Sequence, residues 1–150
     1  VVILFGITCT IAYALCKKYD KNRLRKEMLV CNSLDREQFI SKCEPFDYKK
    51  FMRKSGYGNY FKITGTITEC TADHKIWIYN DDMPFKLAGM DGNTHKGIIL
   101  SLHNLEDESL YKPNACVTAY GFCNSVTKEF VAGYGFITIP IITVYYAEIY

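Results

Sequence analysis

The sequence lacks the short motifs that most often carry catalysis or phosphate binding. It contains no serine nucleophile elbow, no phosphate-cradling glycine loop and no HExxH pair. Its three histidines, His74, His95 and His103, are scattered, and only Cys70 stands at a plausible ligand spacing, from His74. A zinc site needs further ligands, and none follows at zinc-site spacing. These absences predict a protein that is not an enzyme and that holds no metal or cofactor.

Paired cysteines are also missing. The sequence has no CxxC pair, and its seven cysteines are an odd number. An odd set without paired spacing is typical of free thiols in a reducing compartment rather than of a disulfide framework. Cys116 and Cys123 are the pair to consider for a redox role, but on a single strand they would face opposite sides. We therefore expect free thiols.

The globular part of the chain has no surplus of basic charge. Residues 17–27 carry six basic and two acidic residues, a net +4, whereas the whole chain is only +2. A domain that binds nucleic acid usually carries its own basic face. The charge distribution therefore argues against a nucleic-acid partner.

The first 16 residues contain no charge and run directly into the basic stretch. As a helix they would span about 24 Å, slightly less than the roughly 30 Å hydrocarbon core of a bilayer. The chain does not begin with Met, which indicates that upstream residues are missing. The pattern predicts a single-pass transmembrane anchor followed by a basic juxtamembrane helix, together residues 1–30. A signal-peptide core and a buried core helix are the alternatives.

The basic residues beside this run bear on orientation and on lipid binding. Lys and Arg next to a span tend to stay in the cytoplasm, which favours a cytoplasmic domain, with an exported domain as the alternative. The same side chains would contact anionic lipid headgroups, or else form a solvated continuation of the helix. They are Lys17, Lys18, Lys21, Arg23, Arg25 and Lys26.

Two short helices are expected in a helical linker, residues 31–58. Ser33 is a candidate N-cap because acidic residues follow it, and the helix should end before Pro45, since the residue before proline disfavours helical backbone. A second helix is expected over residues 47–53, before a glycine-containing break.

Residues 59–150 have the pattern of a small β-barrel. Residues 60–70 alternate, with Phe61, Ile63 and Ile67 on one face and with Gly65 in the middle, where glycine permits a bend. Pro140 should lie at an edge or a break. Five strands with a long, bent first strand predict a mainly β fold with an OB-type barrel. The other strands are expected at residues 75–79, 96–102, 116–122 and, as one long strand or a broken pair, 130–134 and 137–149.

Three stretches of this region carry a resemblance. They are the run PFDYKKFMRKSGYGNYFKITGTITEC, the VTAYG of the fourth strand, and the IPII and YAEI of the last strand. Together they resemble a bacterial OB-fold family related to tRNA-anticodon-binding domains, in its anchored or exported members. One departure is that Lys112-Pro113-Asn114 stands where the family usually has a Gly-Asp turn. The resemblance covers about residues 45–150. It implies the fold and an anchored layout but no catalytic residues.

Aromatic residues on the second strand are the strongest candidates for binding. With the isoleucines of that strand in the core, Trp77 and Tyr79 project onto the outer face that OB-folds use for oligonucleotides or oligosaccharides. Lys62 and Tyr120, on the first and fourth strands, complete the candidate set. The alternative is that the N-terminal helices or a partner subunit cover Trp77 and Tyr79.

These features together predict a non-catalytic, membrane-anchored OB-fold protein that acts as a structural or accessory subunit of a larger membrane assembly or filament. Its partners would be membrane lipid and other protein subunits or copies of itself. The alternative is a membrane-tethered module that binds an oligonucleotide, glycan or peptide. Burial of Trp77 and Tyr79 against protein would favour the subunit, and an open groove at these residues would favour the binding module.

Overall fold

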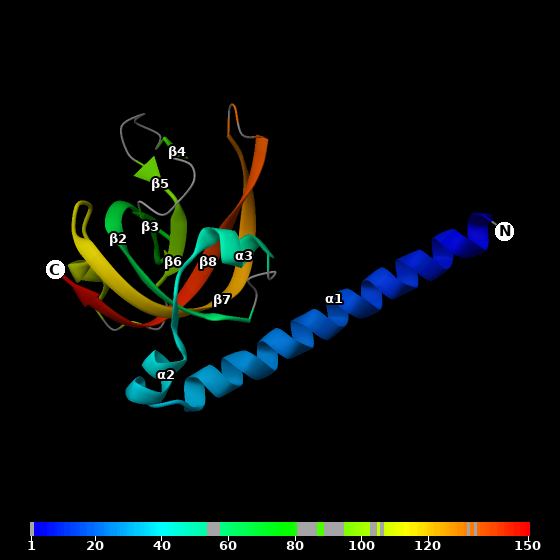
Figure 1. Cartoon of the computed structure of the whole chain (residues 1–150), viewed down its shortest axis with the longest axis horizontal. Helices are drawn as coiled ribbons and strands as arrows, with labels where there is room; N and C mark the ends of the chain where they lie inside the picture. Colours follow the sequence, from blue (N-terminus) through cyan, green and yellow to red (C-terminus); the bar gives the residue numbers. More distant parts are fainter. Residues whose placement is uncertain are drawn as a thin grey trace. The chain divides into compact units, whose positions relative to one another are not determined.

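The computed structural model describes residues 2–53, 58–80, 87–88, 95–102, 105, 107–131, 133 and 135–150. Its contacts divide the chain into two compact units, Val1–Leu34 and Asp35–Tyr150. The first unit is helical, and the second is built mainly of strands with a few short helices (Figure 1). The mainly β fold class predicted for the globular part is confirmed.

The first unit is one helix, α1 (Val2–Ser33), of 32 residues. At 1.5 Å per residue it is about 48 Å long, and it continues from the apolar run through the basic stretch without a break. The six basic side chains of that stretch are all exposed. Among the described residues, no helix is both long and apolar enough to cross a membrane. The predicted transmembrane anchor therefore finds no support in the structure.

The next helix, α2 (Arg36–Lys42), begins later than predicted. Ser33 is the last residue of α1, so its predicted role as N-cap is wrong. Asp35 caps α2 instead: its carboxylate accepts from the backbone N–H of Gln38 (2.8 Å), and Gln38 Oε1 accepts from the N–H of Asp35 (3.2 Å). This reciprocal capping box satisfies two donors that the first helical turn leaves open. The helix ends before Pro45, as predicted.

Two short elements connect α2 to the barrel, β1 (Glu44–Pro45) and α3 (Tyr48–Arg53). The helix predicted over residues 47–53 is confirmed, and it starts one residue later. The carboxylate of Asp47 accepts from the backbone N–H of Lys50 at 2.9 Å, which satisfies a free donor of the first turn of α3.

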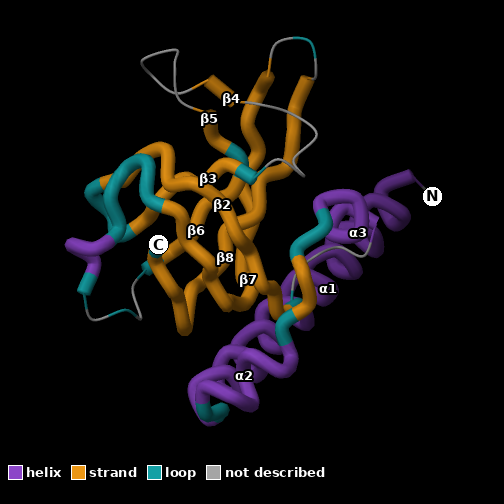
Figure 2. Tube along the Cα trace, turned by 60° about the vertical axis from the view of Figure 1, so that its left-hand side comes forward, coloured by secondary structure: helices purple, strands orange, loops and turns teal. Residues whose placement is uncertain are grey.

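Five strands close into a barrel, which Figure 2 shows from a second side. The order is β2-β3-β6-β8-β7, and β7 pairs back with β2. Four of these pairings are antiparallel, and that of β6 with β8 is parallel. The predicted closed barrel of five strands is thus confirmed. Its strands are β2 (Tyr60–Thr71), β3 (Lys75–Tyr79), β6 (Ile98–Ser101), β7 (Cys116–Val131) and β8 (Gly135–Ile149).

Three smaller elements complete the described chain. The strand β4 (Leu87–Ala88) pairs with β5 (His95–Lys96) in a separate sheet, and a 3₁₀ turn spans Glu108–Leu110. The strand β1 pairs with β2 in parallel, through Glu44 opposite Phe61. It thereby extends the barrel sheet where the linker enters it.

Closure of the barrel depends on one strand that changes partners. β2 pairs with β7 from Tyr60 to Thr66 and with β3 from Thr66 to Thr71. Gly65 lies at this change, and a Cβ there would stand 2.5 Å from the carbonyl oxygen of Tyr79. No side chain fits at that distance, so glycine allows β3 to approach β2 closely.

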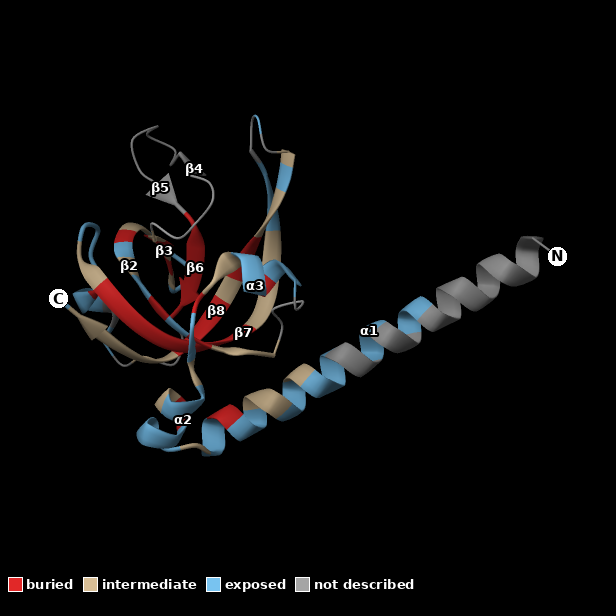
Figure 3. Ribbon diagram, in the orientation of Figure 1, coloured by how far each residue is buried: buried red, intermediate tan, exposed pale blue. Residues whose placement is uncertain are grey.

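The core follows the alternation of the strands (Figure 3). Phe61, Ile63 and Ile67 of β2 face inward, as predicted, and are at most 6% exposed. The residues between them lie on the outer wall of the barrel, where a binding partner could reach them. Residues that share the core with the β2 side chains include Ile76, Ile78, Ile98, Leu100, Val117, Ala119, Ile142 and Val144.

Two strands continue past the rest of the barrel. The fourth strand was predicted to end at residue 122, but β7 runs on to Val131, and the last strand starts only at Gly135. β8 gains its second neighbour, β6, from Ile141 onward. Residues 124–131 and 135–140 therefore form a two-stranded ribbon. Pro140 lies where β8 pairs on one side, with β7, so the predicted edge position is confirmed.

Candidate binding surfaces

Trp77 and Tyr79 lie on the outer wall of β3, as predicted. The neighbouring Ile76 and Ile78 are 2% and 0% exposed, so the side chains of opposite parity point away from the core. Both aromatic residues are half-buried. They are thus neither covered completely nor fully open to solvent.

An apolar row that includes Trp77 crosses the outer wall. Trp77 is the partner of Ile99 on β6, and Ile99 is the partner of Ile141 on β8. Directly paired residues share a face of the sheet, so these three side chains lie next to one another. Ile99 is 7% exposed, and Ile141 is half-buried. A sheet face that meets water usually carries polar side chains, so this row has the chemistry of a contact surface.

Lys62 and Tyr120 form a second feature of the wall. They are direct partners in the pairing of β2 with β7, and Lys62 Nζ stands 5.7 Å from the centroid of the Tyr120 ring. This distance permits a cation–π contact. Beside them, the hydroxyl oxygens of Thr64 and Thr118 are 2.9 Å apart. Because Tyr120 is 7% exposed and Lys62 is exposed, a ligand would meet the lysine first.

The four predicted binding residues lie on two parts of the outer wall. Trp77 and Tyr79 share β3, whereas Lys62 and Tyr120 face each other across β2 and β7. Lys62 lies four residues before Thr66, the partner of Tyr79. This separation is about 13 Å at the rise of a β-strand. We therefore describe the two pairs as two surfaces of the wall.

An aromatic cluster that sequence reasoning missed fixes α2 to the barrel. Phe39 is 0% exposed, and its ring centroid lies 4.8 Å from that of Tyr145, 5.3 Å from Tyr60 and 5.6 Å from Tyr146. The N-terminal helices were expected as a possible cover for the aromatic residues of β3, but Phe39 packs on β2 and β8. A single phenylalanine on a seven-residue helix produces no periodicity, so the sequence offers no signal for this contact.

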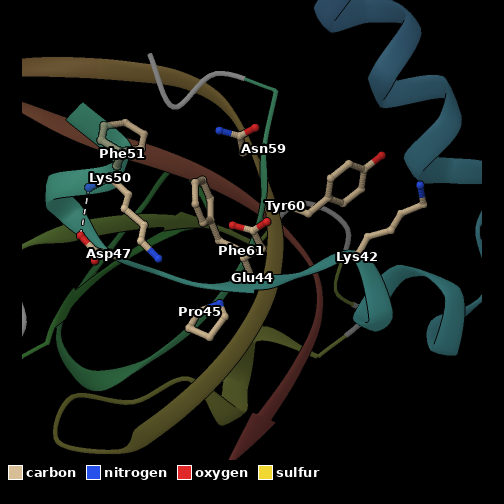
Figure 4. A pocket seen from close by; sticks show the side chains of 9 residues that line it. All are labelled: Lys42, Glu44, Pro45, Asp47, Lys50, Phe51, Asn59, Tyr60 and Phe61. Atoms are coloured by element: carbon tan, nitrogen blue, oxygen red, sulfur yellow. Dashed lines mark hydrogen bonds between the residues drawn. The ribbon is translucent and has the colours of Figure 1, made fainter. Parts of the chain in front are cut away.

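A cavity of about 210 Å³ lies where α2, β1, α3 and β2 meet (Figure 4). Two lysines and two carboxylates line it, so it has no preference for a ligand of one charge. Lys42 Nζ stands 5.6 Å from the ring centroid of Tyr60. The carboxylate of Asp47 already caps α3, because it accepts from the backbone N–H of Lys50. This hydrogen bond holds the pKa of Asp47 below its usual value. The lining residues are Lys42, Glu44, Pro45, Asp47, Lys50, Phe51, Asn59, Tyr60 and Phe61.

The thiols show no activated nucleophile at the two positions where a pKa shift is resolved. Burial raises the pKa of Cys123 to about 12, and burial also raises that of Cys70. Both thiols are therefore protonated at neutral pH and react slowly. Cys70, Cys116 and Cys123 are free thiols, and Cys123 is buried while Cys116 is half-buried.

The described residues contain no group of three or more His, Cys, Asp or Glu side chains that could hold a metal ion. Of the three histidines considered above, only His74 has a described side chain, and it lies in the turn between β2 and β3. His103 and the side chain of His95 fall outside the described residues.

Comparison with known proteins found no match among family models, curated proteins or solved structures. The resemblance to an OB-fold family therefore stays a prediction.

Proposed function

We propose that this protein is a non-catalytic accessory subunit of a membrane assembly, in which the barrel is a rigid protein-interaction domain. The apolar row of Trp77, Ile99 and Ile141 carries the proposal. Tyr79 stands on the same outward face of β3 as Trp77. Aromatic residues, Trp and Tyr above all, are enriched among those that dominate the energy of protein interfaces. The partner on this row is another subunit or a second copy of the chain.

The apolar and basic composition of residues 1–27 supports a place at a membrane. Six basic residues directly after the apolar run favour a cytoplasmic domain on a single-pass protein, with an exported domain as the alternative. Their exposure on α1 fits contact with anionic headgroups.

The barrel itself is proposed to be of the OB type. Its first strand pairs with the second and the fourth, and its third and fifth strands pair in parallel. This order supports a five-stranded Greek-key barrel of that type. The proposal includes a relation to the anticodon-binding OB-fold family, for which the motif similarity is the support.

The first experiment is purification of the full chain from its native membrane in mild detergent, followed by mass measurement under native conditions. We expect a mass that contains partner subunits. Trp77→Ala should weaken partner retention about thirtyfold, as expected for an interface hot spot. Leu110→Ala is the matched control, because Leu110 is an exposed apolar residue, at 58%, that is not a member of the row. A bare 17.2 kDa chain in detergent would overturn the proposal.

The second candidate is a membrane-tethered module for an oligonucleotide, glycan or peptide. The exposed lysine over Tyr120 favours it, because a cation beside an aromatic ring suits stacking ligands. Titration of a bare chain with such ligands, followed by the fluorescence of its single tryptophan, Trp77, would test it.

A further inference from the structure

The ribbon, residues 124–131 and 135–140, carries an exposed pair of aromatic side chains near its outer end. Phe130 and Phe136 are direct partners across it, and their ring centroids are 5.4 Å apart in an edge-to-face arrangement. They are 67% and 77% exposed. Figures 1 and 2 both show β7 and β8 extending past the other strands of the barrel. Single exposed apolar residues are common, but two in contact at the end of an extended element form an apolar wedge.

The charge around the wedge matches a lipid surface. No residue from 130 to 147 is charged. Lys128 is exposed and, two residues before Phe130, shares its face of the ribbon, whereas Glu129 faces the other side. Aromatic rings favour the headgroup level of a bilayer, and a lysine beside them is attracted to anionic lipid. The same chain also carries an apolar run and six basic residues within residues 1–27.

The ribbon is built to present this wedge. The two strands are paired as far as Val131 and Gly135, so the polar groups between them are satisfied within the ribbon. Midway along it, the hydroxyl of Tyr48 donates to the carbonyl of Thr138, the partner of Lys128, at 2.8 Å, which ties the ribbon to α3. Shallow insertion leaves the outer edges of the ribbon at headgroup depth, where water can satisfy their backbone groups.

We propose that Phe130 and Phe136 insert into the headgroup region of an anionic bilayer, with Lys128 contacting the lipid phosphates or carboxylates. This contact goes beyond the accessory role proposed above and does not involve the row on β3. It would orient the barrel unit at the membrane surface.

The test follows a single tryptophan placed at the tip of the ribbon. The full chain carrying Trp77→Phe and Phe136→Trp is mixed with vesicles of phosphatidylcholine and phosphatidylserine at roughly three to one, with brominated acyl chains as quenchers. We expect a blue-shifted emission that the brominated lipid quenches. The matched control carries Trp77→Phe and Tyr150→Trp, because Tyr150 is 74% exposed and lies outside the ribbon. Its emission should shift and quench much less.

Lys128→Gln, added to the tip variant, should weaken insertion about fivefold on anionic vesicles and leave it unchanged on neutral ones, as expected for one lysine at an anionic surface. Equal quenching at Tyr150→Trp and Phe136→Trp would mean general adsorption and would overturn the proposal. So would an unshifted tip tryptophan. A blue shift without lipid, together with a doubled mass, would assign the tip to a second copy instead. The proposed accessory role can fail separately: a chain that retains no protein partner would still give the tryptophan emission and quenching expected here.

Discussion

At Gly65 the barrel closes through a contact that only a missing side chain permits. The nearest atom to a Cβ at this position would be a backbone oxygen, that of Tyr79, at 2.5 Å. A backbone atom in a paired strand cannot rotate away as the end of a flexible side chain can. The absence of a side chain at this one residue therefore decides whether β2 can pair with β3 and β7 at the same time.

We predict that Gly65→Ala lowers the free energy of unfolding by about 1–3 kcal/mol or more, as overpacking in a close-packed region does. Urea unfolding followed by circular dichroism measures it. Thr66→Ala is the matched control, because this neighbour is exposed and surface changes usually stay within about 0.5 kcal/mol. Equal stability of the Gly65→Ala variant and the wild type would contradict the tight approach.

At the scale of elements, α2 combines a precise cap with a single buried anchor. Asp35 and Gln38 close the capping box, and Phe39 occupies the aromatic cluster on the barrel wall. Arg36 adds an ion pair to Glu148 at 3.0 Å, but both side chains are well exposed, so it contributes little. Attachment of the helix therefore depends mainly on the buried ring.

We predict that Phe39→Ala destabilises the barrel unit by about 3–5 kcal/mol, the usual cost of deleting a buried phenylalanine. Asp35→Ala should cost about 1 kcal/mol, because it removes the cap and leaves the anchor in place. Both are measured by chemical denaturation. Ile40→Ala serves as comparison, since Ile40 is only half-buried and should lose less than Phe39. If Phe39→Ala and Ile40→Ala lower the free energy of unfolding equally, the aromatic cluster is not what holds the helix.

In the whole molecule, contacts divide the chain into the units Val1–Leu34 and Asp35–Tyr150, and a prediction follows from this division. A chain of residues 35–150 should fold alone, with the β-type circular dichroism and the urea midpoint that the full chain shows. The physical reason is that the barrel core draws its side chains from residues 46–149. The comparison of the two unfolding curves checks it. A clearly lower midpoint for the shorter chain would show that α1 stabilises the barrel.

The sequence by itself determined the parts of the fold that depend on local pattern. Alternation located β2 and β3 and identified which of their residues face inward, so the outward position of Trp77 and Tyr79 follows from the pattern alone. The helix α3 was likewise predictable. For Gly65 the pattern predicted a bend, whereas the structure shows a close approach of β3 to the backbone at this residue. Residues 81–86 and 89–94, between β3 and β6, lie outside the described residues. The prediction of an N-cap at Ser33 was wrong. Both Ser33 and Asp35 are residue types that suit an N-cap, but Gln38 completes a capping box only with Asp35.

Only the tertiary structure decided which residues meet across strands and elements. The row of Trp77, Ile99 and Ile141 depends on the register of three strands that are far apart in the sequence. The separation of the Lys62–Tyr120 pair from the β3 residues depends on the partner change along β2. The ribbon was not predicted because residues 124–129, polar except for Val126, have the composition of a loop, and only their pairing with β8 makes them a strand. Side-chain direction is a local property of a strand, but register is set by contacts over the whole chain, and no local pattern contains it.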